Sequence, residues 1–272
     1  MSKNHKRITK DEDIINFYNH IPKKYLNEVE NPNYDIHNIE IPFRMAVVAP
    51  SGSGKTNFVC NLLKVFSKNP GTFADVYIIT ANKDEPLYNY LEGEFNGQIR
   101  VKEGLNSLPR LDDFDKKENH LVIIDDLVLE KNLDAVKKYF IRARKLNVSV
   151  AFLSQSYFDI PTIIRKNCTY LVVMDLGGSN REIKAIMSEW AGELDRMVLF
   201  AMYHDAVSEH LRPFIIKGGK TNENQKYRKG WRDYYNVQEY KDRVAREESK
   251  EVVPKKRRGK KVDVDSSSDE EA

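Results

Sequence analysis

The chain lacks the features of membrane-spanning, secreted and disulfide-rich proteins. No apolar run approaches the roughly 20 residues of a membrane-spanning helix, and the polar N-terminus lacks the apolar core of a signal peptide. We therefore expect a protein of the cytosol or nucleus with no membrane span. Its two cysteines, Cys60 and Cys168, lie far apart in apolar contexts, which favours buried thiols over a disulfide or a metal site.

The chain also contains few histidines and has a small net charge. The six histidines are scattered without the spacing of metal ligands, so we expect no zinc site. The formal net charge of +3 is too small to imply DNA binding by itself. With 40% hydrophobic and 31% charged residues, the 272-residue chain has the composition of a soluble globular protein with a sizeable core.

The most informative stretch is the phosphate loop, residues 49–56, which reads Ala-Pro-Ser-Gly-Ser-Gly-Lys-Thr between a strand-like and a helix-like run. Lys55 can reach the β- and γ-phosphates of a nucleoside triphosphate, and the Thr56 hydroxyl can bind Mg²⁺ at the helix N-terminus. Ala49 replaces the usual first glycine without loss of this chemistry, because the later positions hold the phosphates. The nucleotide-binding residues that we expect are Ser51, Gly52, Ser53, Gly54, Lys55 and Thr56.

Strand-like and helix-like segments alternate around this loop, which predicts an α/β fold with a parallel sheet and helices on both faces. We expect strands at 44–49, 75–80, 120–124, 148–153, 169–174 and 213–217. We expect helices at 55–67, 85–92, 132–146, 160–166, 179–190 and 193–203. Ser179 and Glu182 have the Ser-x-x-Glu spacing of a capping box at the start of the helix that ends near Trp190.

The sequence divides into three expected parts. Residues 1–40 are polar and rich in Asn, with prolines that break any long helix, and we expect a partly ordered N-terminal arm. Residues 41–246 form the globular domain. Residues 247–272 lack apolar periodicity and are expected to be a disordered tail. Its basic cluster, 255–261, is either a phosphate contact or a nuclear import signal.

An apolar strand ends in two carboxylates about 70 residues after the phosphate loop, at Asp125 and Asp126. Ligands gather at the carboxyl ends of the strands in parallel sheets. We expect Asp125 to hold Mg²⁺ and Asp126 to orient or deprotonate the attacking water. The next strand runs into Gln155. If that strand lies beside the Asp125 strand, the Gln155 amide can sense the γ-phosphate and help to position water.

Three arginines are candidates for stabilising the transition state as arginine fingers: Arg142, Arg144 and Arg165. Such a residue neutralises charge on the transferring phosphoryl group, and in ring ATPases it comes from the adjacent subunit. Each arginine taken alone is also compatible with a surface or structural role, because the helix dipole favours cations near helix C-termini.

Four linked motifs follow one another in an order and spacing that resemble one group of ATPases. They occupy residues 49–56, 123–126, 142–144 and 152–157, the last followed by 160–161 and 164–167. Over residues 40–217 the chain thereby resembles the genome-packaging ATPases of the FtsK/HerA P-loop superfamily, of the type found in large eukaryotic DNA viruses, virophages and related mobile elements.

The resemblance implies an additional-strand, RecA/FtsK-like ATPase with ATP and Mg²⁺ as cofactors. Lys55 and Thr56 would bind nucleotide and metal, Asp125 and Asp126 would form the acidic pair, and Gln155 would be the sensor. Asp126 stands where many relatives carry Glu, which has the longer reach. The implied function is ATP-driven translocation of double-stranded DNA into a viral capsid. The implied partners are a homo-oligomeric ring, pentamer or hexamer, and the capsid vertex or capsid proteins. The implied location is a cytoplasmic virus factory, the nucleus or the virion.

Two other functions are compatible with a phosphate loop. A P-loop small-molecule kinase would need a substrate pocket and an arginine-rich lid, and it would leave the Gln155 strand unexplained. A nucleotide-gated assembly or adaptor protein would hydrolyse ATP slowly to reset binding. The segment 226–235 interleaves cations with aromatic residues, which suits either DNA contact or docking onto the core.

Overall fold

A computed structural model describes residues 16–22, 30–95, 97–127, 129–130, 132–219 and 221–251. In these ranges one nine-stranded sheet has the order β3-β2-β4-β5-β1-β6-β7-β8-β9. Six strands are parallel to one another: β1 (Arg44–Val48), β2 (Asp75–Thr80), β3 (Ile99–Glu103), β4 (His120–Asp125), β5 (Val148–Ser154) and β6 (Tyr170–Val173). Three antiparallel strands extend one edge: β7 (Phe214–Lys217), β8 (Tyr227–Lys229) and β9 (Asp233–Tyr234).

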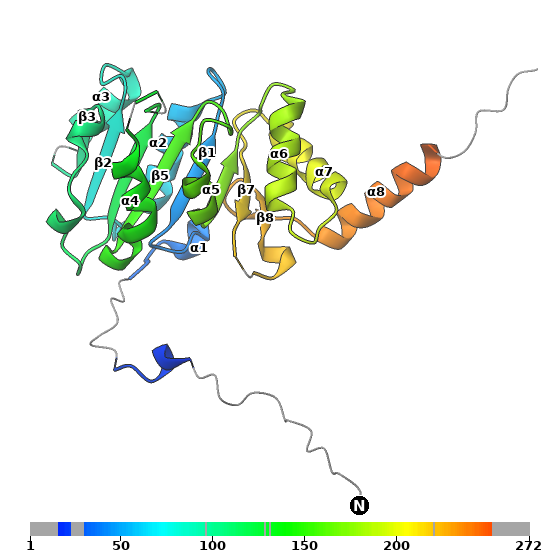
Figure 1. Ribbon diagram of the computed structural model, residues 1–272, viewed down its shortest axis with the longest axis horizontal. Coiled ribbons are helices and arrows are strands. Elements are labelled where there is room, and N and C mark those ends of the chain that lie inside the picture. The colour runs from blue at the N-terminus through cyan, green and yellow to red at the C-terminus, as the bar shows by residue number, and fades with distance from the viewer. Residues whose placement is uncertain are drawn as a thin grey trace, which may run out of the picture.

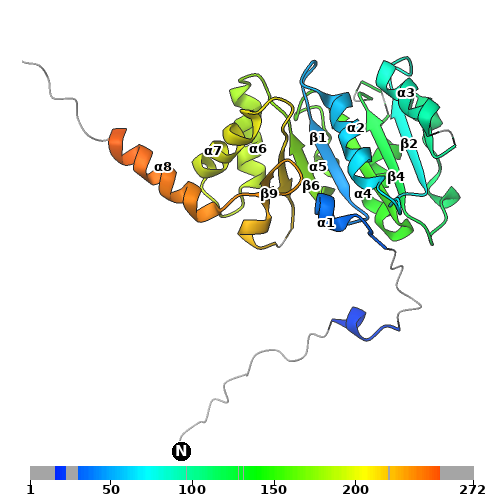
Figure 2. The same cartoon turned by 180° about the vertical axis from the view of Figure 1, so that it is seen from behind.

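Helices cover both faces of this sheet (Figures 1 and 2). One face carries α1 (Tyr34–His37), α2 (Lys55–Phe66) and α3 (Pro86–Glu94). The other carries α4 (Asp134–Arg142), α5 (Thr162–Asn167), α6 (Asn180–Trp190) and α7 (Arg196–Val207). Helix α8 (Val237–Glu251) packs against α7 and then extends away from the body (Figure 1). No helix in the described ranges has the length and apolar character needed to cross a membrane.

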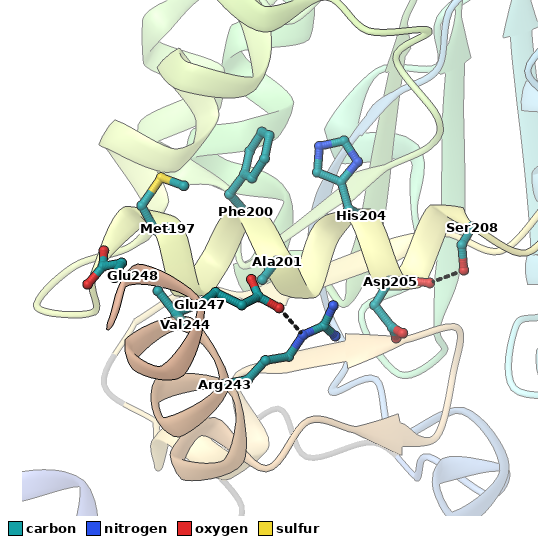
Figure 3. A pocket seen from close by; sticks show the side chains of 10 residues that line it. All are labelled: Met197, Phe200, Ala201, His204, Asp205, Ser208, Arg243, Val244, Glu247 and Glu248. Atoms are coloured by element: carbon teal, nitrogen blue, oxygen red, sulfur yellow. Dashed lines mark hydrogen bonds and ion pairs between the residues drawn. The ribbon is translucent and has the colours of Figure 1, made fainter. Parts of the chain in front are cut away.

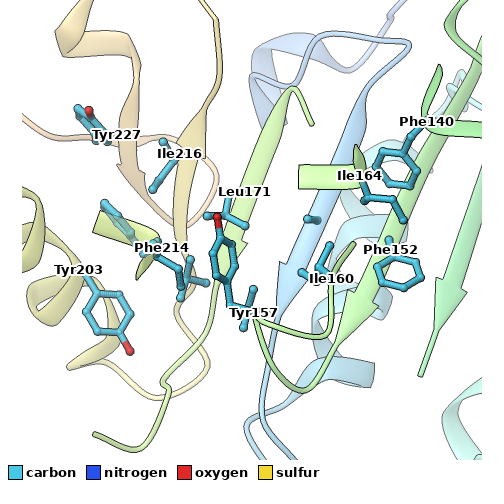
Figure 4. Packing of buried hydrophobic residues seen from close by; sticks show 14 of the residues in the cluster. Phe140, Phe152, Tyr157, Ile160, Ile164, Leu171, Tyr203, Phe214, Ile216 and Tyr227 are labelled. Carbon is cyan, nitrogen blue, oxygen red and sulfur yellow. The ribbon is translucent and has the colours of Figure 1, made fainter. Parts of the chain in front are cut away.

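The core lies on both faces of the parallel strands. Every residue of β4 and of β5 is buried, as expected for central strands that are covered by helices on both sides. On the α4–α7 face, aromatic side chains fill the space between helices and sheet, among them Phe140, Phe152 and Phe214 (Figure 4). Cys60 and Cys168 are free thiols, and burial raises the pKa of both.

The expected α/β fold is confirmed, with element ends that shift by a few residues. The helix expected at 132–146 is an α-helix only over Asp134–Arg142 and continues as a 3₁₀ helix over Ala143–Leu146. Strands β3, β8 and β9 were not expected. They lie at or next to the edges of the sheet and are short or carry charged residues, so they lack the continuous apolar run of the central strands.

The described chain joins the core earlier than the expected boundary at residue 41. Asn33, His37 and Ile39 are buried although they fall in the expected arm, because Asn33 donates to backbone carbonyls after α2 and His37 packs on Phe66. At the other end α8 continues beyond the boundary at residue 247. The basic and acidic clusters of the tail lie outside the described residues.

Candidate nucleotide-binding site

The phosphate loop connects the carboxyl end of β1 to the first residue of α2, as the sequence predicts. Gly52 and Gly54 have positive φ angles of 78° and 92°, which glycine adopts without steric cost. At Gly54 a side chain would also collide with Leu211, whose loop packs against this turn. Ala49 is buried, and its N–H donates to the Ser154 carbonyl, so this position needs no glycine.

Sheet register brings the three predicted motifs to one edge. Strand β5 lies between β1 and β4, and Ser154 is level with Val48 while Leu153 is level with Asp125. Because the three strands are parallel, their carboxyl ends all meet the phosphate loop. The condition stated for Gln155, that its strand lies beside the Asp125 strand, is therefore met.

The Lys55 ammonium lies between the two predicted carboxylates. Its Nζ is 3.4 Å from Asp125 Oδ1 and forms an ion pair with Asp126 Oδ2. The side chains of Lys55 and Asp125 are only 11% and 7% exposed, so this charge cluster is largely withdrawn from water. In such a cluster a phosphate group can compete with the carboxylates for Lys55, and a metal cation can compete with Lys55 for the carboxylates.

Asp125 is held from the opposite side by a residue that the sequence did not reveal. The Tyr88 hydroxyl, buried on α3, donates to Asp125 Oδ2 at 2.7 Å. Burial raises the pKa of the Asp125 carboxyl, and Lys55 and this hydroxyl act in the opposite direction. Nothing in the local sequence identifies Tyr88, because it approaches Asp125 from a helix 37 residues away.

Asp126 leaves the strand in a left-handed conformation, with φ of 55°. Asp tolerates this region better than most residues, and such angles often mark functional turns. The turn directs its carboxylate to Lys55 and to Gln155, whose Nε2 donates to Asp126 Oδ2 at 3.0 Å. The structure thus brings together Lys55, Asp125, Asp126 and Gln155, as the sequence predicts.

The residues fit a divalent cation. Within the described chain the buried Asp126 Oδ1 has no hydrogen-bond partner, and the buried Asp125 Oδ1 has only the ion pair with Lys55. Thr56 follows Lys55 at the start of α2. Oxygen donors of this kind suit Mg²⁺, which is commonly held by one or two carboxylates together with substrate phosphates. Across the described ranges no three His, Cys, Asp or Glu side chains cluster as a ligand set.

The capping box expected at the start of α6 is wrong. Ser179 makes no capping hydrogen bond through its side chain. Glu182 is buried and accepts hydrogen bonds from the Ser156 hydroxyl and the Tyr157 N–H, at 2.5 and 2.8 Å. The spacing correctly predicted the start of a helix. The Glu182 carboxylate, however, binds the Tyr157 N–H of a distant turn instead of the backbone of its own helix.

The three arginines lie in different settings. Arg142 and Arg144 are exposed and lie at the amino end of β5. Gln155 follows the other end of this seven-residue strand, and the two ends are about 20 Å apart. Within one chain they cannot reach the phosphate loop. Arg165 is held in place: it donates to the Tyr157 carbonyl, pairs with Glu189 and stacks over the Tyr157 ring.

The segment 226–235 docks onto the core. Arg228 is 1% exposed and donates to the carbonyls of His37 and Asn38. Lys229 pairs with Glu209 at 2.6 Å, and Trp231 stacks on Phe58 of α2 with ring centroids 5.4 Å apart. These contacts leave Arg228 and Lys229 unavailable for DNA phosphates.

A separate groove lies between α7 and α8 (Figure 3). Its lining mixes apolar side chains such as Met197 and Phe200 with an Arg243–Glu247 ion pair. It shares no residue with the phosphate loop, the acidic pair or Gln155, so we assign it no part in nucleotide binding.

The chain is similar to known proteins over the segment that forms this site. A family model described as Poxvirus A32 protein matches residues 33–228. The DNA packaging protein OPG160 of Variola virus and that of Vaccinia virus (strain Copenhagen) are each 28% identical over 158 residues, covering 53% of this chain and 57% of theirs. The chain therefore spans little more than half the length of these relatives.

Two solved structures have a similar arrangement. The genome packaging NTPase B204 of Sulfolobus turreted icosahedral virus 2, in complex with ATP-gammaS, has a TM-score of 0.48 and 16% identity, covering 70% of this chain and 98% of that one. EssC (ATPases 2 and 3) of Geobacillus thermodenitrificans has a TM-score of 0.48 and 14% identity, covering 79% and 46%. Likenesses of this size carry no functional assignment.

The match to the family model covers much more of the functional site and of the chain than a short motif would. The matched segment runs from the first buried residues before β1 to the buried Arg228 of β8, and so includes the phosphate loop, the acidic pair and Gln155. It covers well over half of the 272 residues. The chain belongs to the Poxvirus A32 protein family.

Proposed function

We propose that this protein is an ATPase that drives double-stranded DNA into a viral capsid. The observation that carries the proposal is the cluster in which Lys55 lies between Asp125 and Asp126 while Gln155 binds Asp126. Phosphoryl transfer needs little covalent chemistry from a protein, so catalysis depends on positioning and charge stabilisation. This cluster supplies both at the end of a phosphate loop.

Each residue has a distinct part in the proposed reaction. Backbone N–H groups of 51–54 hold the phosphates, and Lys55 moves its charge from the acidic pair to the β- and γ-phosphates. Thr56 and Asp125 would hold Mg²⁺, which supplies charge neutralisation on the phosphates when bound. Asp126, freed from Lys55, orients or deprotonates the attacking water, and Gln155 fixes the Asp126 carboxylate and contacts the γ-phosphate.

Gln155 favours a hydrolase over a small-molecule kinase. A kinase must keep water away from the γ-phosphate and present an acceptor instead. The contact of an exposed Gln155 amide with the Asp126 carboxylate, at 3.0 Å beside the phosphate loop, supports a role in orienting water.

The DNA and capsid parts of the proposal rest on the family. The OPG160 relatives are named DNA packaging proteins. We propose the same task here, carried out by a homo-oligomeric ring, pentamer or hexamer, at a capsid vertex. The task places the protein where virions assemble, in the host cytoplasm or nucleus.

DNA-stimulated ATP hydrolysis tests this function directly. The purified protein is expected to hydrolyse ATP faster when long duplex DNA is added, and the stimulation is expected to fall as salt rises, because phosphate contacts are screened. An adaptor that hydrolyses ATP only to reset binding, or a kinase, would not respond to duplex DNA. A rate that long duplex DNA leaves unchanged would count against a translocase.

We also propose that an arginine acts across the subunit interface, with Arg142 and Arg144 the best placed because both are exposed. A subunit carrying Arg142→Ala or Arg144→Ala, mixed with an Asp126→Asn subunit, is expected to recover part of the ATPase activity that neither has alone. Some interfaces then combine an intact acidic pair with an intact arginine. Mixed oligomers that assemble but recover nothing would exclude a trans role for that arginine. Arg165→Ala mixtures are the comparison, since its guanidinium is held within its own chain.

A further inference from the structure

The turn that follows Gln155 is held by helix α6. Glu182 Oε1 accepts two hydrogen bonds, from the Ser156 hydroxyl at 2.5 Å and from the Tyr157 N–H at 2.8 Å. Glu182 is only 9% exposed, and it lies in the first turn of α6, where the helix dipole favours a carboxylate. Glu182 therefore links the turn after β5 to the first turn of α6.

Tyr157 is fixed from further directions. Its carbonyl accepts from Arg165 at 3.2 Å, and its hydroxyl donates to Glu189 at 2.7 Å and accepts from Trp190 Nε1 at 3.0 Å. The ring itself is fully buried in the core between the sheet and the helices (Figure 4). Both backbone polar groups and the side chain of Tyr157 are therefore tied to α5 and α6.

Gln155 lies between two fixed points. Before it, Ser154 is the last residue of β5 and its hydroxyl donates to the Ser156 carbonyl. After it, Ser156 and Tyr157 are held by Glu182. Gln155 itself is exposed, so the direction of its side chain, and with it the contact with Asp126, depends on these anchors.

We propose that Glu182 is a positioning residue that sets the orientation of Gln155 toward Asp126 and the γ-phosphate. The inference rests on the proposed ATPase function. Glu182 touches neither nucleotide loop nor acidic pair, so it acts only through the turn 155–157. The same contact works in reverse: movement of Gln155 on loss of the γ-phosphate displaces the turn and pulls on α6, which links the nucleotide site to the α6–α7 helices.

The test combines substitutions at Glu182 and Gln155. Glu182→Ala is expected to lower kcat for ATP by up to about 100-fold without changing the affinity for nucleotide, since misplacement of a reacting group by 1 Å has that effect. Glu182→Gln is expected to recover most of the rate, because a single oxygen, Oε1, accepts both hydrogen bonds and an amide carbonyl can replace it. Lys184→Ala, at an exposed position of the same helix, is the matched control and should behave as wild type.

A double-mutant cycle separates positioning from general structural damage. In a Gln155→Ala background, Glu182→Ala is expected to cause no further loss, because the group that it positions is gone. Ser156→Ala, which removes one donor to Glu182, should show the same dependence and serves if Glu182→Ala does not fold. Additive losses, or a Glu182→Gln variant as slow as Glu182→Ala, would overturn the proposal while leaving the ATPase function intact.

Hydrogen exchange gives a readout that does not require turnover. The amide of Tyr157 should exchange faster in Glu182→Ala than in wild type, and addition of ATP-gammaS should slow exchange in α6 of wild type but not of Glu182→Ala. Unchanged exchange in both comparisons would reject the role of Glu182 even in a protein without ATPase activity. Absence of wild-type hydrolysis with the expected exchange pattern would instead reject the proposed function alone.

Discussion

Asp126→Asn is expected to retain ATP binding and to lose hydrolysis, with a rate lower by about 10²–10⁴-fold, the usual contribution of a positioned general base. The substitution is unusually specific here. Asn tolerates the left-handed backbone at φ 55° as well as Asp does, and its amide oxygen can still accept from Gln155. What disappears is the negative charge that pairs with Lys55 and that, in the proposed reaction, activates water.

Single-turnover hydrolysis and equilibrium binding of ATP-gammaS, measured on the same preparation, distinguish the two effects. The matched control is Asp159→Asn, which removes an exposed carboxylate from the loop before α5 and should leave both quantities unchanged. Near-normal turnover by Asp126→Asn would show that another group, or none on this strand, activates the water.

Lys55→Ala is expected to weaken nucleotide binding by at least about 100-fold. In the proposed complex the ammonium makes charge-assisted contacts of about 1.5–3 kcal/mol each with phosphate oxygens, and about 1.4 kcal/mol corresponds to a factor of ten. A second effect acts in the same direction. Without Lys55 the carboxylates of Asp125 and Asp126 face the incoming triphosphate with no cation between them.

Titration with a fluorescent ATP analogue at fixed Mg²⁺ measures this loss. Lys64→Ala, an exposed lysine near the end of the same helix, is the control for charge and helix propensity and should bind as wild type. Tight binding by Lys55→Ala with hydrolysis abolished would mean that the lysine acts mainly in the transition state and that backbone N–H groups account for affinity.

The parts of the site that lie within short runs could be predicted from the sequence. The phosphate loop combines its glycines, Lys55 and Thr56 in consecutive positions, so its chemistry follows from local conformation. The acidic pair and Gln155 lie at the carboxyl ends of buried strands. Parallel strands have their carboxyl ends on the same side of the sheet, so the sequence could predict that these residues lie beside the phosphate loop.

Contacts between distant elements could not be predicted in this way. Tyr88 meets Asp125 from α3, and Arg228 inserts between the segment before β1 and the edge strands, although its neighbours in sequence resemble a DNA-binding stretch. Glu182 matched a local capping pattern and was wrongly assigned to it. In each case a buried polar group forms a hydrogen bond with a residue far away in sequence. Buried polar groups need such partners because they have lost their hydrogen bonds to water.

The sequence by itself determined the α/β class, the phosphate loop, the acidic pair and the position of Gln155 after its strand, because hydrophobic periodicity and motif spacing act over a few residues at a time. Only the tertiary structure decided how the site is held. It placed β5 between β1 and β4, turned Asp126 toward Lys55 and enclosed Arg165 and Arg228 in hydrogen bonds. It left Arg142 and Arg144 exposed at the amino end of β5, opposite the phosphate loop. The physical reason is that strand order and the pairing of buried charges depend on packing across the whole sheet, which no local pattern records.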